Sequence, residues 1–272
     1  MIARRIALVA WHVFKESVRD RVLYGIGVFA ILLVIVSLVV GQLSAGEDVK
    51  IVKDLGWAVI EAAGALMAVF IGVGLIAREI ERRSIFSLLA KPLPRWEFVT
   101  GKYFGLVLTV LVNVAAMTAA LYVVLGYMDW HALPVERRAW DAPAMDPRLF
   151  IAVVMIAAEL ALLTAVALFF STFSSSALLS VVFTAGIFLT GCFSSDLRGF
   201  GDTVDVAPAV AMLVSAIGWI VPAFSAFDVK AQVVHGLALP SGFVAFTLSY
   251  AALYIVALLV ASVTVFSRRE FR

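Results

Sequence analysis

Two acidic side chains lie inside apolar stretches of this chain, and their type and position make them the first candidates for a functional role. Glu61 falls within residues 57–77, and Glu159 falls near the middle of residues 150–170. A charge at the centre of a bilayer costs about 2.5–3.5 kcal/mol on insertion scales, so such a residue usually faces a helix bundle or a polar pathway. Glu159 is therefore expected to face the bundle, either protonated or bonded to a polar neighbour. The polar groups that residues 104–127 offer are Asn113, Thr109 and Thr118.

Each carboxylate also has a purely structural interpretation. Glu61 lies about one turn from the outer end of its stretch, from which it reaches water or lipid headgroups. Glu159 could make an interhelical hydrogen bond, worth roughly 0.6–2 kcal/mol, without lining any pathway. The sequence leaves the pathway and the structural interpretation open for both residues.

The remaining residue types argue against metal or disulfide chemistry. His12, His131 and His235 are far apart, and none belongs to a spacing such as HxxxH or HExxH. Cys192 is the single cysteine, which excludes an internal disulfide and a site built from several thiolates. We therefore expect no metal site, and no cofactor bound by this chain.

The composition places the chain in a membrane. Hydrophobic residues make up 63% of the 272 residues, charged residues only 15%, and the mean hydropathy is +1.06. Too little polar surface remains to cover a soluble globule. No polar segment is long enough for a separate catalytic domain, so the sequence predicts a single all-α transmembrane domain over residues 1–272.

Hydropathy predicts six transmembrane helices, because a span needs about 20 apolar residues. The expected spans cover residues 22–42, 57–77, 104–127, 150–170, 177–193 and 243–266. Six crossings place both termini on one side. The segment 206–221 is also apolar but is interrupted or bounded by Pro208, Gly218 and Pro222, so it is predicted to be a re-entrant or interfacial outer helix before the sixth span.

The distribution of basic residues predicts which side the termini occupy. Of the 21 Lys and Arg residues, five precede the first span, six lie in residues 78–102 and three follow the last span. Short loops rich in Lys and Arg stay in the cytoplasm, so both termini are expected to be cytoplasmic.

The first 21 residues are expected to form an amphipathic helix in the inner membrane interface. Ile6, Val9 and Val13 recur at helical spacing, whereas His12 and Lys15 fall on the opposite side. The alternative is that this segment simply extends the first span.

Residues 78–102, REIERRSIFSLLAKPLPRWEFVTGK, form a charged segment between the second and third spans that we call the elbow. Residues 76–91 have apolar positions at roughly helical spacing, and Glu79 and Arg83 form a favourable i,i+4 pair. Pro92 and Pro94 make continued helix improbable. The elbow is either a rigid contact for a partner protein or a basic loop that anchors to lipid headgroups.

The elbow resembles the corresponding loop of type-2 ABC exporter permeases. The residues that carry the resemblance are Glu79-Ile80-Glu81-Arg82-Arg83-Ser84, Leu88-Leu89-Ala90-Lys91-Pro92, Arg95, Phe98 and Gly101-Lys102. Residues 14–21 and 222–228 are similar to the subgroup related to the permease of nitrous-oxide-reductase maturation. Together with the six-span layout, the resemblance covers essentially the whole chain.

The resemblance implies a half-transporter in the cytoplasmic membrane of a prokaryote, which pairs with a second permease subunit as a homodimer or heterodimer. A separate ATPase subunit would supply ATP and magnesium and would push on a coupling helix in the elbow. The residues implied for this coupling are Glu79, Glu81, Arg82 and Arg83 on the helix, Lys91, Pro92 and Arg95 at the bend, and Gly101 and Lys102 at the start of the third span. The loop at residues 171–176 is short and uncharged, so any second contact would be minor.

This chain lacks the phosphate loop that ATP binding would require. Gly101-Lys102 is preceded by Trp96 where a phosphate loop has its first glycine, and Tyr103 replaces the required Ser or Thr. The chain is therefore expected not to be an enzyme.

Other functions remain open. A proton-coupled secondary transporter would use Glu61 and Glu159, although no internal repeat is visible. A membrane-embedded enzyme would need a cluster of His, Asp or Glu at one face. A membrane assembly factor that binds an ATPase without transporting anything would need the same elbow. Nucleic acid is not an expected partner.

Overall fold

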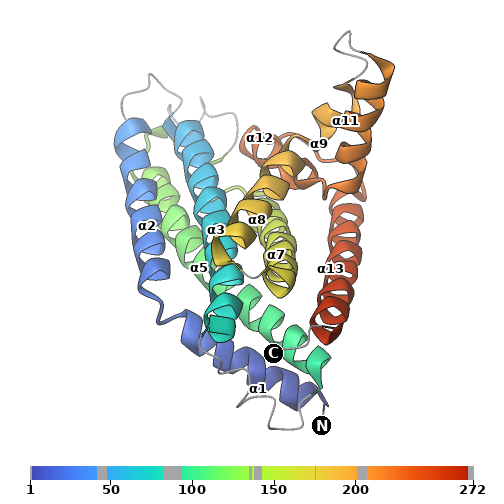
Figure 1. Cartoon of the computed structure of the whole chain (residues 1–272). Helices are drawn as coiled ribbons and strands as arrows, with labels where there is room; N and C mark the ends of the chain where they lie inside the picture. Colours follow the sequence, from blue (N-terminus) through green and yellow to red (C-terminus); the bar gives the residue numbers. More distant parts are fainter. Residues whose placement is uncertain are drawn as a thin grey trace.

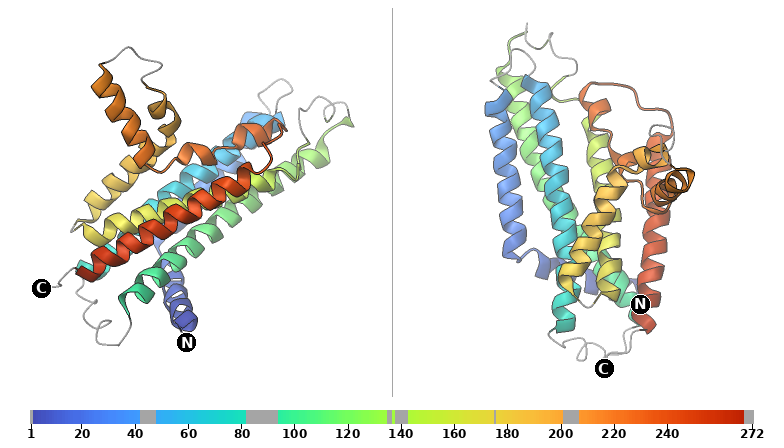
Figure 2. Two further views of the ribbon diagram at one scale, coloured as in Figure 1. Left: turned by 90° about the vertical axis from the view of Figure 1, so that its right-hand side faces the viewer. Right: turned by 45° about the horizontal axis from the view of Figure 1, so that its top comes forward.

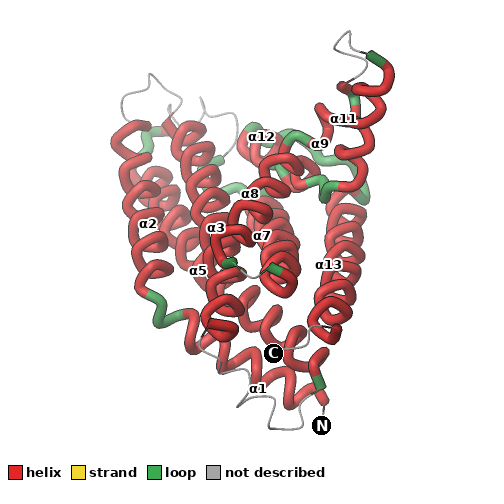
Figure 3. Tube along the Cα trace, in the orientation of Figure 1, coloured by secondary structure: helices red, strands yellow, loops and turns green. Residues whose placement is uncertain are grey.

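We analysed a computed structural model, which describes residues 2–41, 48–81, 94–134, 137, 143–174, 176–200 and 207–268. The described residues are almost entirely helical and contain no strand (Figure 3). The long helices are α2 (Arg21–Gly41), α3 (Asp48–Glu81), α5 (Arg95–His131), α7 (Leu149–Phe173), α8 (Ala177–Cys192) and α13 (Phe243–Arg268).

These helices form because their sequences are long apolar runs without internal proline. In the part of the chain that the structure describes, four helices are long and apolar enough to cross a bilayer, and a bent pair would make a fifth. The four cover Val49–Gly74, Arg95–His131, Leu149–Phe173 and Phe243–Ser267. They contain the predicted third, fourth and sixth spans and overlap most of the second, which supports a multi-pass membrane protein.

The predicted first and fifth spans correspond to α2 and α8. Helix α2 has 21 residues, which is about the length of a span, whereas α8 has only 16. A helix of 16 residues, such as α8, is about 24 Å long, which is less than the hydrocarbon thickness of roughly 30 Å. The count of six crossings therefore stays a prediction.

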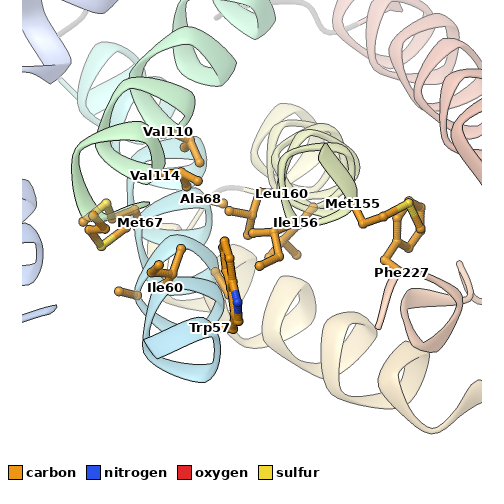
Figure 4. Close-up of a cluster of buried hydrophobic side chains, with 14 of the residues drawn as sticks. Trp57, Ile60, Met67, Ala68, Val110, Val114, Met155, Ile156, Leu160 and Phe227 are labelled. Carbon is orange, nitrogen blue, oxygen red and sulfur yellow. The ribbon is translucent and has the colours of Figure 1, made fainter. Parts of the chain in front are cut away.

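Helix α3 lies at the centre of the bundle and packs against α2, α5 and α7. Figure 4 shows Trp57, Ile60 and Met67 of α3 within a buried cluster that also includes side chains of α5 and α7. Small residues bring α3 and α7 close together: a Cβ built on Gly72 would lie 2.6 Å from the Cβ of Ala167. Gly64 and Gly72 thus serve the packing of α3 against α7 within one chain.

The N-terminal helix α1 (Ile2–Ser17) is separate from α2, with a turn between them. It runs across one end of the bundle and packs along the first turns of α5 (Figures 1 and 2). The idea that residues 1–21 extend the first span is therefore wrong, because the chain turns at Val18–Asp20 before α2 begins. The C-terminal end of α13 lies at the same end of the bundle as α1 (Figure 1).

A group of short helices occupies the opposite end of the bundle. It comprises α9 (Ser194–Arg198), α11 (Pro208–Ile220), the 3-10 helix η1 (Phe224–Phe227) and α12 (Lys230–Val234). The helix pair Pro208–Ile220 and Phe224–Val234 is bent by 51°. Helix α11 projects from the end away from α1 (Figures 1 and 2).

Candidate functional site

The elbow joins the ends of α3 and α5 at the α1 end of the bundle. Residues 76–81 continue α3 as one helix, so the amphipathic helix predicted over 76–91 does not begin as a separate element at Ile76. Glu79 and Glu81 belong to the last turn of α3. The other residues implied for coupling before Pro94, namely Arg82, Arg83, Lys91 and Pro92, lie outside the described residues.

Arg95 is the first residue of α5, and it connects the elbow to the last helix of the chain. Its Nη1 donates hydrogen bonds to the carbonyl oxygens of Phe266, at 3.3 Å, and Ser267. These carbonyls are in the last turn of α13, where helical carbonyl groups lack partners of their own. The rings of Phe98 and Phe266 also stack, with centroids 6.0 Å apart. The C-terminal part of the elbow, where α5 begins, is therefore bonded to the end of α13.

A buried carboxylate, two residues further along α5, lies next to α1. Glu97 is 2% exposed, and its Oε2 accepts no hydrogen bond among the described residues. Nη1 of Arg5, on α1, lies 3.9 Å from this oxygen. A carboxylate with so little access to solvent is stabilised by a nearby cation. Glu97 therefore favours the position of α1 that places Arg5 next to it.

Gly101 and Lys102 lie inside α5 rather than at its start, because the helix begins at Arg95. A Cβ built on Gly101 would lie 2.7 Å from the Cβ of Val9, so α1 can pack here only against a glycine. Lys102 is 1% exposed, with its ammonium 4.5 Å from the centre of the Phe98 ring. Both residues thus contribute to the packing around the first turns of α5.

A second polar cluster lies toward the other end of α3. Glu61 on α3 forms an ion pair with Lys230 on α12, and the Lys230 ammonium is 3.5 Å from Oδ1 of Asp228. The side chains of Glu61 and Lys230 are 19% and 21% exposed. The pair therefore fastens the outer group of short helices to α3 across 169 residues of sequence.

Glu159 on α7 lies beside this ion pair. It is 3% exposed and interacts electrostatically with Glu61, Lys230 and Asp228. It faces the bundle, as expected. We call the four residues Glu61, Glu159, Asp228 and Lys230 the outer cluster.

Within the described helices, none of the expected polar partners on the third span bonds to Glu159, and two of them bond to carbonyl oxygens of their own helix. The Asn113 amide donates to the carbonyl oxygen of Thr109 at 2.9 Å, and the Thr109 hydroxyl donates to the carbonyl oxygen of Gly105. Asn113 Oδ1 would lie 3.4 Å from a Cβ on Gly27, so this amide faces α2. Thr118 Oγ1 is buried without a hydrogen-bond partner among the described residues. Asn113 is thus a residue of the α2–α5 contact.

Sequence reasoning missed two lysines, the half-buried Lys230 and the buried Lys53. The proximity of Lys230 to Glu61 arises from the tertiary fold. Lys53, 1% exposed on α3, donates a hydrogen bond of 2.7 Å to the carbonyl oxygen of Pro143, ahead of α7. The only available signal was an isolated lysine within four residues of an apolar span.

Among the described residues, no three His, Cys, Asp or Glu side chains are arranged to hold a metal ion.

A comparison with protein families gives a match over nearly the whole chain. Residues 7–271 match the family described as ABC-2 family transporter protein, while a search of curated proteins gives no match. Since the matched range covers all the described helices except the first turn and a half of α1, this multi-pass membrane protein belongs to the ABC-2 family and is a permease component of an ABC transporter.

Proposed function

We propose that this permease is the membrane subunit of an ATP-driven exporter in the cytoplasmic membrane of a prokaryote. It would have six spans and cytoplasmic termini, pair with a second permease subunit, and receive force from a separate ABC ATPase subunit. ATP and magnesium would be bound by that partner. The nitrous-oxide-reductase maturation subgroup is the proposed relationship within the family.

The observation that supports this proposal is the set of contacts that the first residues of α5, at the C-terminal end of the elbow, make with α1 and α13. Arg95 bonds to the end of α13, Glu97 faces Arg5 of α1, and Gly101 lies in close contact with Val9 of α1. A displacement of the elbow would therefore be passed to α1, α5 and α13 together rather than being absorbed by a loose loop. This is the property that a coupling segment needs.

Helix α3 would carry the same displacement to the outer cluster. Glu61 and Glu81 are on one continuous helix and are separated by about 30 Å along its axis. Close contacts at Gly64 and Gly72 couple α3 to α7, which carries Glu159. An inward or outward shift of α3 would thus act directly on the Glu61–Lys230 ion pair, and we propose that this pair helps to hold the outer end closed.

A second candidate, the proton-coupled secondary transporter, is favoured by the position of Glu159. Its carboxylate is buried next to a charged pair, which is the arrangement that proton-carrying acids in membranes share. Glu61 is less suited to carrying protons because Lys230 already pairs with it. A non-transporting assembly factor would also retain the elbow, and only a transport assay separates it from the exporter.

The experiment is to tag the C-terminus, purify the protein gently from its own host, and identify the chains that co-purify while ATP hydrolysis is measured. We expect a stoichiometric ATPase subunit and vanadate-sensitive hydrolysis. Reversing the charge at the elbow, with Glu79→Arg or Arg83→Glu, should reduce ATPase association or stimulation by at least tenfold while the protein still inserts.

Arg137→Glu is the matched control, because this exposed arginine lies between α5 and α7, far from the elbow in sequence. Unchanged ATPase association in the elbow variants would rule out their coupling role. A purified permease without any ATPase would favour the proton-coupled alternative, and Glu159→Gln would then be expected to abolish transport.

A further inference from the structure

The side of α1 that faces away from α5 is divided into two strips. Val9 and Val13 point toward α5, since a Cβ on Gly105 would lie 2.7 Å from the Cβ of Val13. The first of the two outward strips is basic and contains the exposed side chains of Arg4, His12 and Lys15 on the helix, followed by that of Arg19 in the turn after it. Glu16 is the acidic residue next to it.

The basic strip contains a shallow hollow to which the described residues offer no bonding partner. The hollow has a volume of about 470 Å³ and is lined by His12, Lys15, Glu16 and Arg19. None of these side chains makes a hydrogen bond or ion pair with another described residue. Lys15 is in the last turn of α1 and Arg19 is in the turn that follows the helix, and both line the hollow, so both can reach the same anionic group.

The second strip is apolar and lies beside the basic one. Trp11 is 60% exposed, and the ring centroid of Phe14 lies 5.5 Å from that of Trp11. Leu8, also 60% exposed, is an apolar residue within the basic strip, four residues from both Arg4 and His12. A tryptophan at the border between an apolar and a basic surface is typical of segments at the headgroup level of a bilayer. A contact with a soluble ATPase would explain the basic strip but would leave the exposed apolar side chains unaccounted for.

We propose that the basic strip of α1 binds the phosphate groups of anionic phospholipids in the inner leaflet, with Lys15 and Arg19 as the principal contacts. This inference rests on the proposed cytoplasmic position of α1. Helix α1 packs against Gly101 and Gly105, near the point where the elbow continues into α5. A headgroup bound to α1 therefore restrains the position of α1 relative to the elbow. Anionic lipid is thus a regulator of coupling.

The test is native mass spectrometry of the detergent-solubilised full chain titrated with phosphatidylglycerol and, separately, with phosphatidylcholine of the same acyl chains. Each basic residue near an anionic surface contributes about fivefold in affinity. We expect Lys15→Gln/Arg19→Gln to weaken phosphatidylglycerol binding by about tenfold or more and to leave phosphatidylcholine binding unchanged. Glu16→Gln, which removes the negative charge from the hollow, should strengthen phosphatidylglycerol binding.

Arg137→Gln is the control for a loss of basic charge elsewhere, since this side chain already pairs with Asp129. Equal phosphatidylglycerol binding by the double variant and the unchanged protein would overturn the proposal, as would an equal loss in Arg137→Gln. So would a double variant that keeps its lipid but no longer co-purifies with an ATPase, because the strip would then be a protein contact. Lipid binding is measured without any ATPase, so it is judged separately from the exporter function.

Discussion

Charged side chains in an apolar bundle are stable only where the fold gives them partners. Glu61 and Lys230 meet this condition as an ion pair, and Glu97 meets it partly through Arg5. The sequence alone indicated Glu61 and Glu159, because an acidic residue inside a long apolar run is detectable without a structure. It did not indicate Lys230 as their neighbour, since that proximity depends on how the segment after α11 folds back over α3 and α7.

The outer cluster leads to a prediction at the scale of single residues. Lys230→Met leaves Glu61 without its cation and Glu61→Gln leaves Lys230 without its anion, so each is expected to destabilise the protein by about 3 kcal/mol. The double variant should recover most of that loss, because both charges are then gone. The measurement is a double-mutant cycle of thermal stability in detergent, followed by size-exclusion chromatography.

Asp228→Asn is the control for the outer cluster, because its side chain is 57% exposed and exposed pairs contribute little. Simple additivity of the Lys230 and Glu61 variants would mean that the ion pair does not hold α12 to α3.

At the scale of elements, the contact between α1 and α5 depends on glycines. The sequence predicted that the N-terminal segment is an amphipathic helix, because its apolar residues recur every three or four positions. It could not predict the partner, since Gly101 and Gly105 become a contact surface only once α1 turns back across α5. A Cβ on Gly105 would lie 2.6 Å from the carbonyl oxygen of Ala10, which is a backbone atom that cannot move aside alone.

Gly105→Ala is therefore expected to displace α1, even though alanine is the better helix former. Overpacking costs about 1–3 kcal/mol, which exceeds the gain in helix propensity of about 1 kcal/mol. Limited trypsin digestion should then cut after Lys15 or Arg19 several times faster than in the unchanged protein. The same substitution at Gly126, on the same helix with no atom within 4 Å of the added Cβ, is the matched control and should not change the rate. Slow cleavage in both variants would show that the glycine contact does not hold α1 in place.

At the scale of the whole molecule, composition was sufficient to assign the class and hydropathy located the helices. The ends of the helices were less predictable: α3 and α5 extend beyond the predicted spans, because helical backbone bonds continue into polar sequence where neighbouring helices support it. The topology of the last third depends on α11 and α12, which composition cannot resolve, because 13 apolar residues followed by a bend fit either a short crossing or an outer hairpin.

The re-entrant interpretation of this segment makes a topological prediction. In a Cys192→Ser background, Ala209→Cys and Leu237→Cys lie before and after the bend, and both are expected to react with a membrane-impermeant maleimide added outside spheroplasts. Both positions are exposed: Ala209 is in α11, and Leu237 follows α12 by three residues. Both helices lie at the end of the bundle away from α1 (Figure 1). Ala3→Cys, on α1, should react only after the membrane is permeabilised. If Leu237→Cys instead reacts together with Ala3→Cys, the segment crosses the membrane, α13 runs in the reverse direction, and the basic C-terminus lies outside. That outcome would also separate the C-terminal end of α13 from the cytoplasmic elbow, and the hydrogen bonds of Arg95 to α13 could not exist in the membrane-inserted protein.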